Sequence, residues 1–250
     1  MSKLCKILCL TNYPSKNFVA NALLAAGASP LMSLYDKEIE ELVQEADAVC
    51  VNIGTLDDRS IDAMRLAAAK AYELGIPWVL DPVAVTASAQ RASLSLELVK
   101  RFHPSIIRGN ASEIRALSWL VRDADSYRNI RCGIDSTLDS NDVLQDAIAL
   151  SSATGAAVAM SGKTDYVVTP EGVDAIAGGS PLMARVTAMG CVASAMCALF
   201  AATEPSGREA AIKALGLMKK AGCAAGKVAK GPGSFAVEFL DELANESRIS

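Results

Sequence analysis

A glycine and a cysteine, Gly190 and Cys191, stand where a turn leads into an apolar stretch that extends to residue 202. The first N–H groups of a helix have no partner within it, and the helix dipole is positive at that end. We therefore predict that segment 187–191, which starts with Thr187, binds an anion such as a phosphate group. Gly190 would let the backbone turn tightly, and a thiol at this position is expected to have a lowered pKa. A plain turn with a buried cysteine is the alternative, and the residues alone leave both open.

Charged residues follow two other apolar runs of the chain. Arg108 ends one run, and Asn110 and Glu113 have the spacing of a capping box, in which each side chain accepts from the other residue's backbone. Asp81 comes directly after another run, where a carboxylate can hold a metal ion or its water. The structural alternatives are capping for Asn110 and Glu113, which the residues alone favour, and a simple turn before proline for Asp81.

A third segment, Ser-Gly-Lys-Thr at 161–164, looks like the end of a phosphate-binding P-loop. The P-loop requires a glycine five residues before the glycine of its Gly-Lys pair, and Ala157 stands there. Residues 165–168 have a strand pattern where a P-loop needs a helix. We therefore predict a polar turn between two strands, starting at Ser161 and compatible with contact to a nucleotide. A P-loop ATPase is the alternative, which loss of nucleotide binding in Lys163→Ala would support.

The elements that must position these residues alternate between strand and helix. Apolar, β-branched runs occur at 6–10, 48–52, 77–80, 105–108 and 156–160, and those at 166–169 and 174–177 indicate a hairpin. Apolar residues recur at helical spacing from residues 39 and 61 onward. The last third of the chain is predicted to be mostly helical, at 190–202, 208–228 and 234–245. This alternation predicts an α/β fold with a mostly parallel sheet covered on both faces. We expect one domain, 1–250, with ligands beyond the carboxyl ends of the strands.

The composition of the 250 residues excludes several classes of protein. A net charge of −4 with 24 basic and 28 acidic residues argues against nucleic acid, and no run approaches the about 18 apolar residues of a membrane helix. Seven cysteines without a Cys-x-x-Cys pair indicate reduced thiols in the cytoplasm, with Cys132 and Cys197 as packing residues. His103 is the only histidine of the sequence, which excludes mechanisms that need two. The hydrophobic share is 51 %, or about 56 % when glycine is counted and tyrosine is not, which exceeds the typical share of about 45–50 % and favours an oligomer.

Short motifs follow one another along the chain in an order typical of one enzyme family. They are NFVAN and GASPLM within 11–32, NIGTL at 52–56, DPV at 81–83, IRGNASEI at 107–114, GIDS at 133–136, SGKTDYV at 161–167, VTAMGC at 186–191 and GPGSF at 231–235. Together they resemble the hydroxyethylthiazole kinase family, whose fold is ribokinase-like, with three layers in α/β/α order. The likeness runs almost from end to end.

The resemblance implies ATP-dependent phosphorylation of the hydroxyl of 4-methyl-5-(2-hydroxyethyl)thiazole in thiamine salvage. It also implies a homotrimer with active sites at subunit interfaces. Motif by motif, it assigns contacts with ATP to Arg108, Asn110, Ser161 and Thr187, and Mg²⁺ to Asp81 and Glu113. It assigns the thiazole pocket to Asn12, Met32, Gly54 and Gly190. It also implies two catalytic residues, Gly190 near the hydroxyl and Cys191 where ribokinase-like relatives have an aspartate base.

The chain departs from the family pattern near these residues. Ala84 follows the DPV motif where a glycine is common, and Ala188 and Met189 replace the usual Gly-Thr before Gly190. The segment 13–16 is also more polar than expected beside a thiazole. Two further alternatives therefore stay open. One is a ribokinase-like kinase for a related alcohol, of the hydroxymethylpyrimidine or pyridoxal type. The other is a thiazole or nucleotide binder without turnover, which the bulk of Met189 would favour.

Overall fold

The computed structural model of the protein describes residues 4–123 and 143–247, so Cys132 and the motif at 133–136 lie outside the described residues. Within the described part, an eight-stranded sheet forms the middle layer. In spatial order its strands are β2 (Ser29–Met32), β1 (Lys6–Leu10), β3 (Ala48–Asn52), β4 (Trp78–Asp81), β5 (Ile106–Asn110), β6 (Ala157–Ser161), β7 (Asp165–Thr169) and β8 (Gly172–Ile176). The strands from β2 to β6 are parallel, and β7 and β8 add an antiparallel hairpin. This arrangement confirms the predicted sheet.

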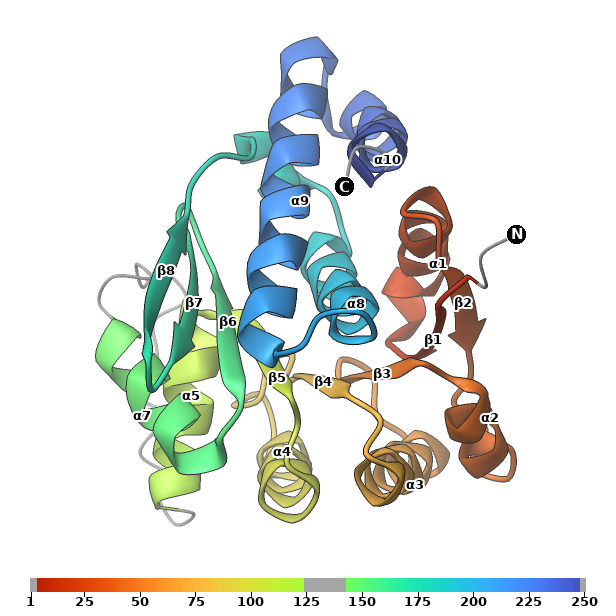
Figure 1. The fold of residues 1–250 in the computed structure, drawn as a ribbon, viewed down its shortest axis with the longest axis vertical. Helices are drawn as coiled ribbons and strands as arrows, with labels where there is room; N and C mark the ends of the chain where they lie inside the picture. The colour runs from red at the N-terminus through yellow and green to blue at the C-terminus, as the bar shows by residue number, and fades with distance from the viewer. Residues whose placement is uncertain (1–3, 124–142, 248–250) are drawn as a thin grey trace.

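Helices cover both faces of the sheet (Figure 1). One face carries α1 (Lys16–Ala25), α8 (Met189–Ala201), α9 (Gly207–Val228) and α10 (Pro232–Ser247). The other face carries α2 (Ile39–Glu45), α3 (Asp58–Leu74), α4 (Ala89–Phe102), α5 (Ala111–Arg122) and α7 (Leu144–Thr154). Among the described residues, no helix combines the length and the apolar character needed to cross a membrane.

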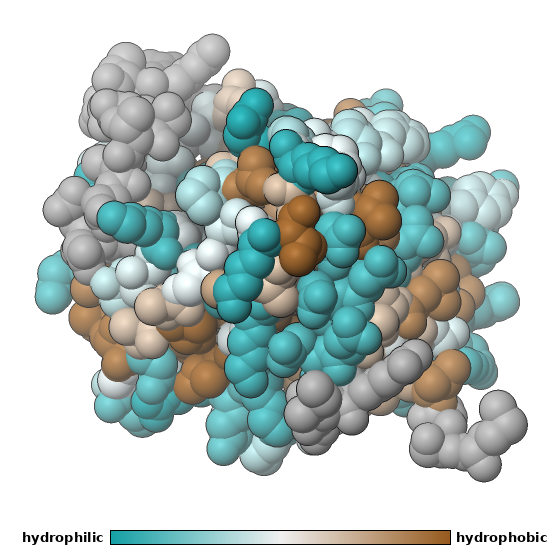
Figure 2. Space-filling model, turned by 90° about the horizontal axis from the view of Figure 1, so that it is seen from above, coloured by the Kyte–Doolittle hydropathy of each residue, from teal (hydrophilic) through white to brown (hydrophobic). Residues whose placement is uncertain are grey.

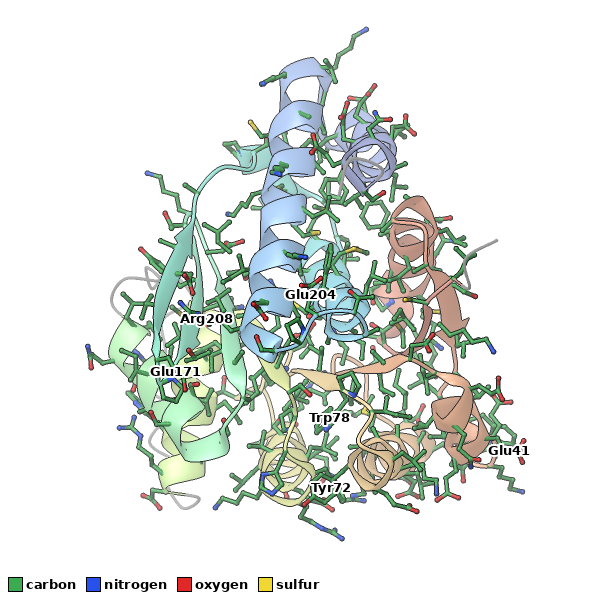
Figure 3. All side chains as sticks on the ribbon, in the orientation of Figure 1. Glu41, Tyr72, Trp78, Glu171, Glu204 and Arg208 are labelled. Carbon is green, nitrogen blue, oxygen red and sulfur yellow. The ribbon has the colours of Figure 1, made fainter. Side chains whose placement is uncertain are left out.

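Successive side chains of each strand point to opposite faces of the sheet, and this divides the core into two layers. In β1, Ile7 and Cys9 pack toward the layer of α8, whereas Leu8 and Leu10 pack toward the layer of α3. Successive strand side chains point to opposite faces, so a run buried on both faces reads as continuously apolar. Trp78 of β4 lies on the side of α3 and α4 (Figure 3), is 1 % exposed, and donates from Nε1 to the carbonyl of Phe102 at 2.9 Å.

Strand β2 and helix α1 were not predicted, and helices α4 and α7 were expected only from the alternation of strands and helices. Strand β2 is a half-buried edge strand of four residues that contains Pro30. Proline lacks an N–H and is therefore tolerated in a strand at the edge of a sheet. Because this strand is short and contains proline, its sequence does not resemble that of a typical strand. The predicted strands are all present with ends within two residues, and Cys197 is fully buried, as expected of a packing residue.

Candidate active site

Polar side chains stand at the carboxyl ends of five neighbouring parallel strands. Asn12 follows β1, Asn52 ends β3 and Asp81 ends β4. Arg108 lies near the end of β5, and Ser161 ends β6. Because β1, β3, β4, β5 and β6 are adjacent in this order, the five residues form a row along one edge of the sheet. Helix α8 packs across four of these strands and brings its N-terminus to the row.

Hydrogen bonds join the first half of this row to α8. Asn12 donates from Nδ2 to Oδ1 of Asn52 at 2.9 Å, and Asn52 donates from Nδ2 to Oδ2 of Asp81 at 2.6 Å. The hydroxyl of Ser194 donates to the same oxygen of Asp81 at 2.7 Å. Sγ of Cys191 lies 3.2 Å from Nδ2 of Asn12 and 3.3 Å from Nδ2 of Asn52. The cluster therefore holds the thiol against two amide donors.

The acidity of Cys191 differs from the prediction. Burial raises the pKa of the thiol, and the negative charge of Asp81 raises it further, while hydrogen bonds from Asn12 and Ser15 act against the rise. The expected lowering at a helix N-terminus was wrong because removal of the thiolate from water outweighs the helix dipole. In the free protein the group is a thiol at neutral pH.

Asp81 is fully buried, and its two oxygens differ. Oδ2 accepts the two bonds from Asn52 and Ser194, whereas Oδ1 has no hydrogen-bond partner among the described residues. Burial raises the pKa of Asp81 to about 7, and Arg108 opposes that rise while Glu113 adds to it. A buried carboxylate oxygen without a donor fits a cation at this end of the sheet. Within the described ranges, no group of three or more His, Cys, Asp or Glu residues could hold a metal ion.

Glu113 and Asn110 form the capping box that their spacing predicts. Asn110 accepts from the N–H of Glu113 at 2.9 Å, and Oε2 of Glu113 accepts from the N–H of Asn110 at 2.9 Å. Oε1 of Glu113 accepts from the N–H of Ala84 at 2.9 Å. The carboxylate thus ties the turn after β4 to the start of α5. Ala84 in that turn has a φ of 51°, a left-handed conformation that favours glycine.

Gly190 has a different role from the one predicted. The tight turn before α8 is made by Ala188, with a φ of 74°. A Cβ at Gly190 would lie 2.6 Å from Nη1 of Arg108, so the missing side chain makes room for the guanidinium. Arg108 is 7 % exposed and donates from Nη2 to Oγ of Ser161 at 2.6 Å. These contacts place a buried cation at the N-terminus of α8.

A pocket of about 810 Å³ opens beside Arg108. Its polar lining includes Arg108, Asn110, Ser161, Lys163 and Lys219, and its apolar lining includes Val186, Leu215, Met218 and Met183, the last from the short helix η4 (Pro181–Arg185). Gly190 and Met189 also line it, and Thr187 is exposed between the lining residues Val186 and Ala188. The pocket thus gathers the predicted ATP residues, apart from Thr187. The turn from 161 to 164 leads into strand β7, which contradicts a P-loop.

The predicted thiazole residues are divided among three places, of which the larger pocket holds Gly190. Met32 lies in a second, smaller pocket of about 370 Å³, which is also lined by Tyr13, Lys16, Tyr35 and Asp57. Gly54 instead packs against the asparagine pair, since a Cβ there would lie 2.8 Å from Nδ2 of Asn12. Asn12 precedes Tyr13, so one chain segment connects the asparagine pair to the smaller pocket.

Asn52, Ser194 and Arg91 are among the residues of this site that sequence reasoning missed. Asn52 ends an apolar run and Ser194 interrupts an apolar helix, so both were visible as isolated polar residues. Arg91 of α4, by contrast, stands in no sequence pattern that indicates a site residue. Its guanidinium donates to the carbonyl of Ile53 at 3.0 Å, of Val83 at 2.8 Å and of Gly54 at 2.7 Å. Arg91 therefore joins the loop after β3 to the turn after β4.

Comparison with known proteins agrees with this geometry. The model of the hydroxyethylthiazole kinase family matches residues 4–247. The chain belongs to this family. A hydroxyethylthiazole kinase from Syntrophus aciditrophicus is 43 % identical over 94 % of this chain and 84 % of its own. One from Nitratidesulfovibrio vulgaris is 44 % identical over 94 % and 85 %.

Solved structures agree with the fold. The structure of a hydroxyethylthiazole kinase protein from Pyrococcus horikoshii has a TM-score of 0.84 and 34 % identity, covering 96 % of this chain and 88 % of its own. A ribokinase-like superfamily protein from Enterococcus faecalis has a TM-score of 0.68 at 14 % identity, covering 98 % and 86 %. The second likeness concerns the fold alone, which is the ribokinase-like fold that the motifs implied.

Proposed function

We propose that this member of the hydroxyethylthiazole kinase family transfers the γ-phosphoryl group of ATP to the hydroxyl of 4-methyl-5-(2-hydroxyethyl)thiazole, in thiamine salvage. The observation that carries the proposal is the buried Arg108, held against Gly190 at the N-terminus of α8 and at the edge of the larger pocket. A buried cation and free helix N–H groups together favour a polyanion. The relatives at 43–44 % identity are named for this activity.

The larger pocket suits a nucleoside triphosphate. Its end near Arg108, Ser161 and Lys163 offers cations and a hydroxyl for phosphate oxygens. Its other wall, with Met183, Leu215 and Met218, offers an apolar surface for a base. We therefore place the phosphates near Arg108 and the base toward η4, with Asn110 and Thr187 near the phosphate end.

Mg²⁺ fits at Asp81, whose Oδ1 is buried and without a partner among the described residues. Oδ1 would hold the ion together with phosphate oxygens, and Glu113 would reach it through water. The ion would offset negative charge on the phosphoryl group. Asn52 and Ser194 keep the other oxygen of Asp81 in place, which directs Oδ1 toward its ligand.

Cys191 is proposed to receive the substrate hydroxyl. In the reaction the alcohol oxygen forms a bond to the γ-phosphorus, the bond from that phosphorus to the ADP oxygen breaks, and the hydroxyl proton is released. Because burial raises the pKa of Cys191, the thiol mainly aligns the hydroxyl at neutral pH, and the small thiolate fraction takes the proton. Asn12 and Asn52 would stabilise that thiolate by donating to Sγ.

Coupled measurement of ADP release tests this function. MgATP with the thiazole alcohol should release ADP, and the same mixture without the alcohol should not. Dependence on a pyrimidine or pyridoxal alcohol instead would support the related kinase. Measurable thiazole binding without ADP release would support the non-catalytic binder.

We further propose that the whole chain, 1–250, is one kinase domain, that it acts in the cytoplasm, and that three copies assemble with active sites at their interfaces. Support for the assembly comes from the smaller pocket, where Tyr13 and Tyr35 are 58 % and 45 % exposed beside Met32. A second copy would cover these rings. Figure 2 shows apolar side chains scattered among hydrophilic ones on the face that it displays.

A further inference from the structure

A lysine of α9 lies buried behind the turn that ends β6. Lys219 is 7 % exposed, and its Nζ lies 3.0 Å from Oδ1 of Asp165. Nζ also donates to the carbonyl of Gly162 at 3.0 Å and to that of Lys163 at 3.3 Å. An ammonium group has three protons to donate, so these contacts use its whole capacity. Lys219 therefore binds protein groups, although it lines the larger pocket.

Asp165, a buried residue, also binds the same turn. Its Oδ1 accepts from the N–H of Gly162 at 2.9 Å in addition to the ammonium of Lys219. The side chain of Asp165 is 7 % exposed, so both charges of the pair are buried. A buried ion pair is costly to break, because removal of one partner leaves the other charge uncompensated. The pair therefore fixes the conformation of residues 162–165.

The stem of Lys219 also supports a second wall of the pocket. A Cβ on Gly179 would lie 3.1 Å from Cδ of Lys219, and one on Gly178 would lie 3.6 Å from its Cβ. Both glycines line the larger pocket, as do Gly162 and Lys163. One side chain thus contacts the two turns that bound the pocket on this side.

The turn at 162–165 follows Ser161, which is proposed to contact the nucleotide. Ser161, the residue before it, accepts from Arg108 at 2.6 Å, and both side chains line the pocket. A shift of the turn would move Ser161 away from Arg108 and open the phosphate end. By contrast, the contacts of Asn12, Asn52 and Cys191 involve no residue of the turn.

We propose that Lys219 is a positioning residue for the nucleotide, which holds the turns at 162–165 and 178–179 in the conformation that ATP requires. The inference rests on the proposed nucleotide site in the larger pocket. A merely structural role would lower stability and affect both substrates alike. Loss of a positioning residue would weaken the binding of the nucleotide and leave that of the thiazole alcohol unchanged.

The test compares Lys219→Met with Lys220→Met, because Lys220 is the next residue of α9 and is exposed. Titration calorimetry with a non-hydrolysable ATP analogue gives the nucleotide Kd, and steady-state kinetics give the KM of each substrate. We expect Lys219→Met to raise the nucleotide Kd and the KM of ATP at least tenfold, with the KM of the thiazole alcohol within twofold of wild type. Lys220→Met should match wild type in all three.

A double variant separates the ion pair from simple loss of packing. Lys219→Met combined with Asp165→Asn leaves no uncompensated charge, and the asparagine oxygen can still accept from Gly162. This variant should recover part of the nucleotide affinity lost in Lys219→Met. If Lys219→Met does not fold, Asp165→Asn alone should show the same selective rise in the KM of ATP.

The outcomes distinguish this inference from the proposed function. Parallel changes in both KM values, or an unchanged nucleotide Kd in folded Lys219→Met, would overturn the role of Lys219. Nucleotide binding by wild type without thiazole-dependent ADP release would overturn the proposed function, while the Kd comparison would still test Lys219. Absence of nucleotide binding in wild type would overturn both.

Discussion

At the residue scale, burial controls the two acids nearest the proposed reaction. It raises the pKa of Cys191, which the negative charge of Asp81 raises further, and it raises the pKa of Asp81 to about 7. Burial therefore favours the neutral form of both groups, a thiol at Cys191 and a protonated carboxyl at Asp81. A cation at Oδ1 of Asp81 would lower the pKa values of both groups.

Cys191→Ser tests the thiol. We expect the nucleotide Kd to stay within twofold of wild type, because the larger pocket does not include Cys191. We expect phosphoryl transfer to slow by about 10²-fold, the lower range for loss of a general base. Single-turnover measurements at several pH values check this, and the wild-type rate should rise with pH because the thiol pKa is raised. Unchanged single-turnover rates in the variant would rule out the base role.

Asp81→Asn tests the buried carboxyl through its effect on stability. From about pH 4 to the folded pKa of about 7, the unfolded state has lost the proton that the folded state keeps, so the free energy of unfolding falls as pH rises. Three pH units correspond to about 4 kcal/mol. Asparagine has no such proton, so Asp81→Asn should gain stability relative to wild type from pH 5 to pH 8, and should lose phosphoryl transfer.

Urea unfolding at each pH, in EDTA and without nucleotide, measures this difference. Curves for the two proteins that run parallel from pH 5 to pH 8 would show that the carboxyl does not titrate in that range. Activity retained in the variant would argue against Asp81 as the metal residue.

At the scale of elements, two turns at the site contain alanine in a left-handed conformation. Ala84 follows β4 and Ala188 precedes α8, with φ of 51° and 74°. These are two of the positions where the family pattern has glycine. The two strained residues lie in the turn whose Ala84 N–H donates to Glu113 and at the N-terminus of α8, which faces Arg108.

Ala84→Gly and Ala188→Gly should each stabilise the protein by about 0.5–1 kcal/mol, because the left-handed conformation is strained for alanine and not for glycine. Thermal or urea unfolding measures the change. Ala69→Gly, inside α3, is the matched control and should destabilise by about 1 kcal/mol. A loss of stability in the two turn variants equal to that of the control would contradict the assigned strain.

At the scale of the whole molecule, the proposed assembly places a contact between copies at the smaller pocket. Tyr35→Glu places a charge at the proposed contact, so it should shift the protein from three chains to smaller species and raise the KM of the thiazole alcohol. The nucleotide Kd should stay unchanged. Light scattering after size exclusion gives the mass. Tyr72→Glu is the control, because Tyr72 is 56 % exposed near the C-terminal end of α3 (Figure 3), whereas the smaller pocket is lined by the start of that helix. A wild-type mass of one chain would contradict the assembly.

The sequence by itself determined the features that depend on neighbouring residues. Apolar periodicity located the strands, because a buried parallel strand must be apolar on both faces. The spacing of Asn110 and Glu113 predicted their capping box, and the strand pattern after residue 164 excluded a P-loop. Strand order in the sheet then placed Asn12, Asp81 and Arg108 along one edge, as expected for carboxyl ends of parallel strands.

Only the tertiary structure decided the features that depend on burial and on contacts between distant segments. Gly190 is small because Arg108 occupies the space of its side chain, and the raised pKa of Cys191 follows from burial beside Asp81. Lys219 looks like any lysine of an amphipathic helix until its three acceptors converge on it. Local patterns carry no information on such contacts, because desolvation and charge pairing arise only when the layers pack together.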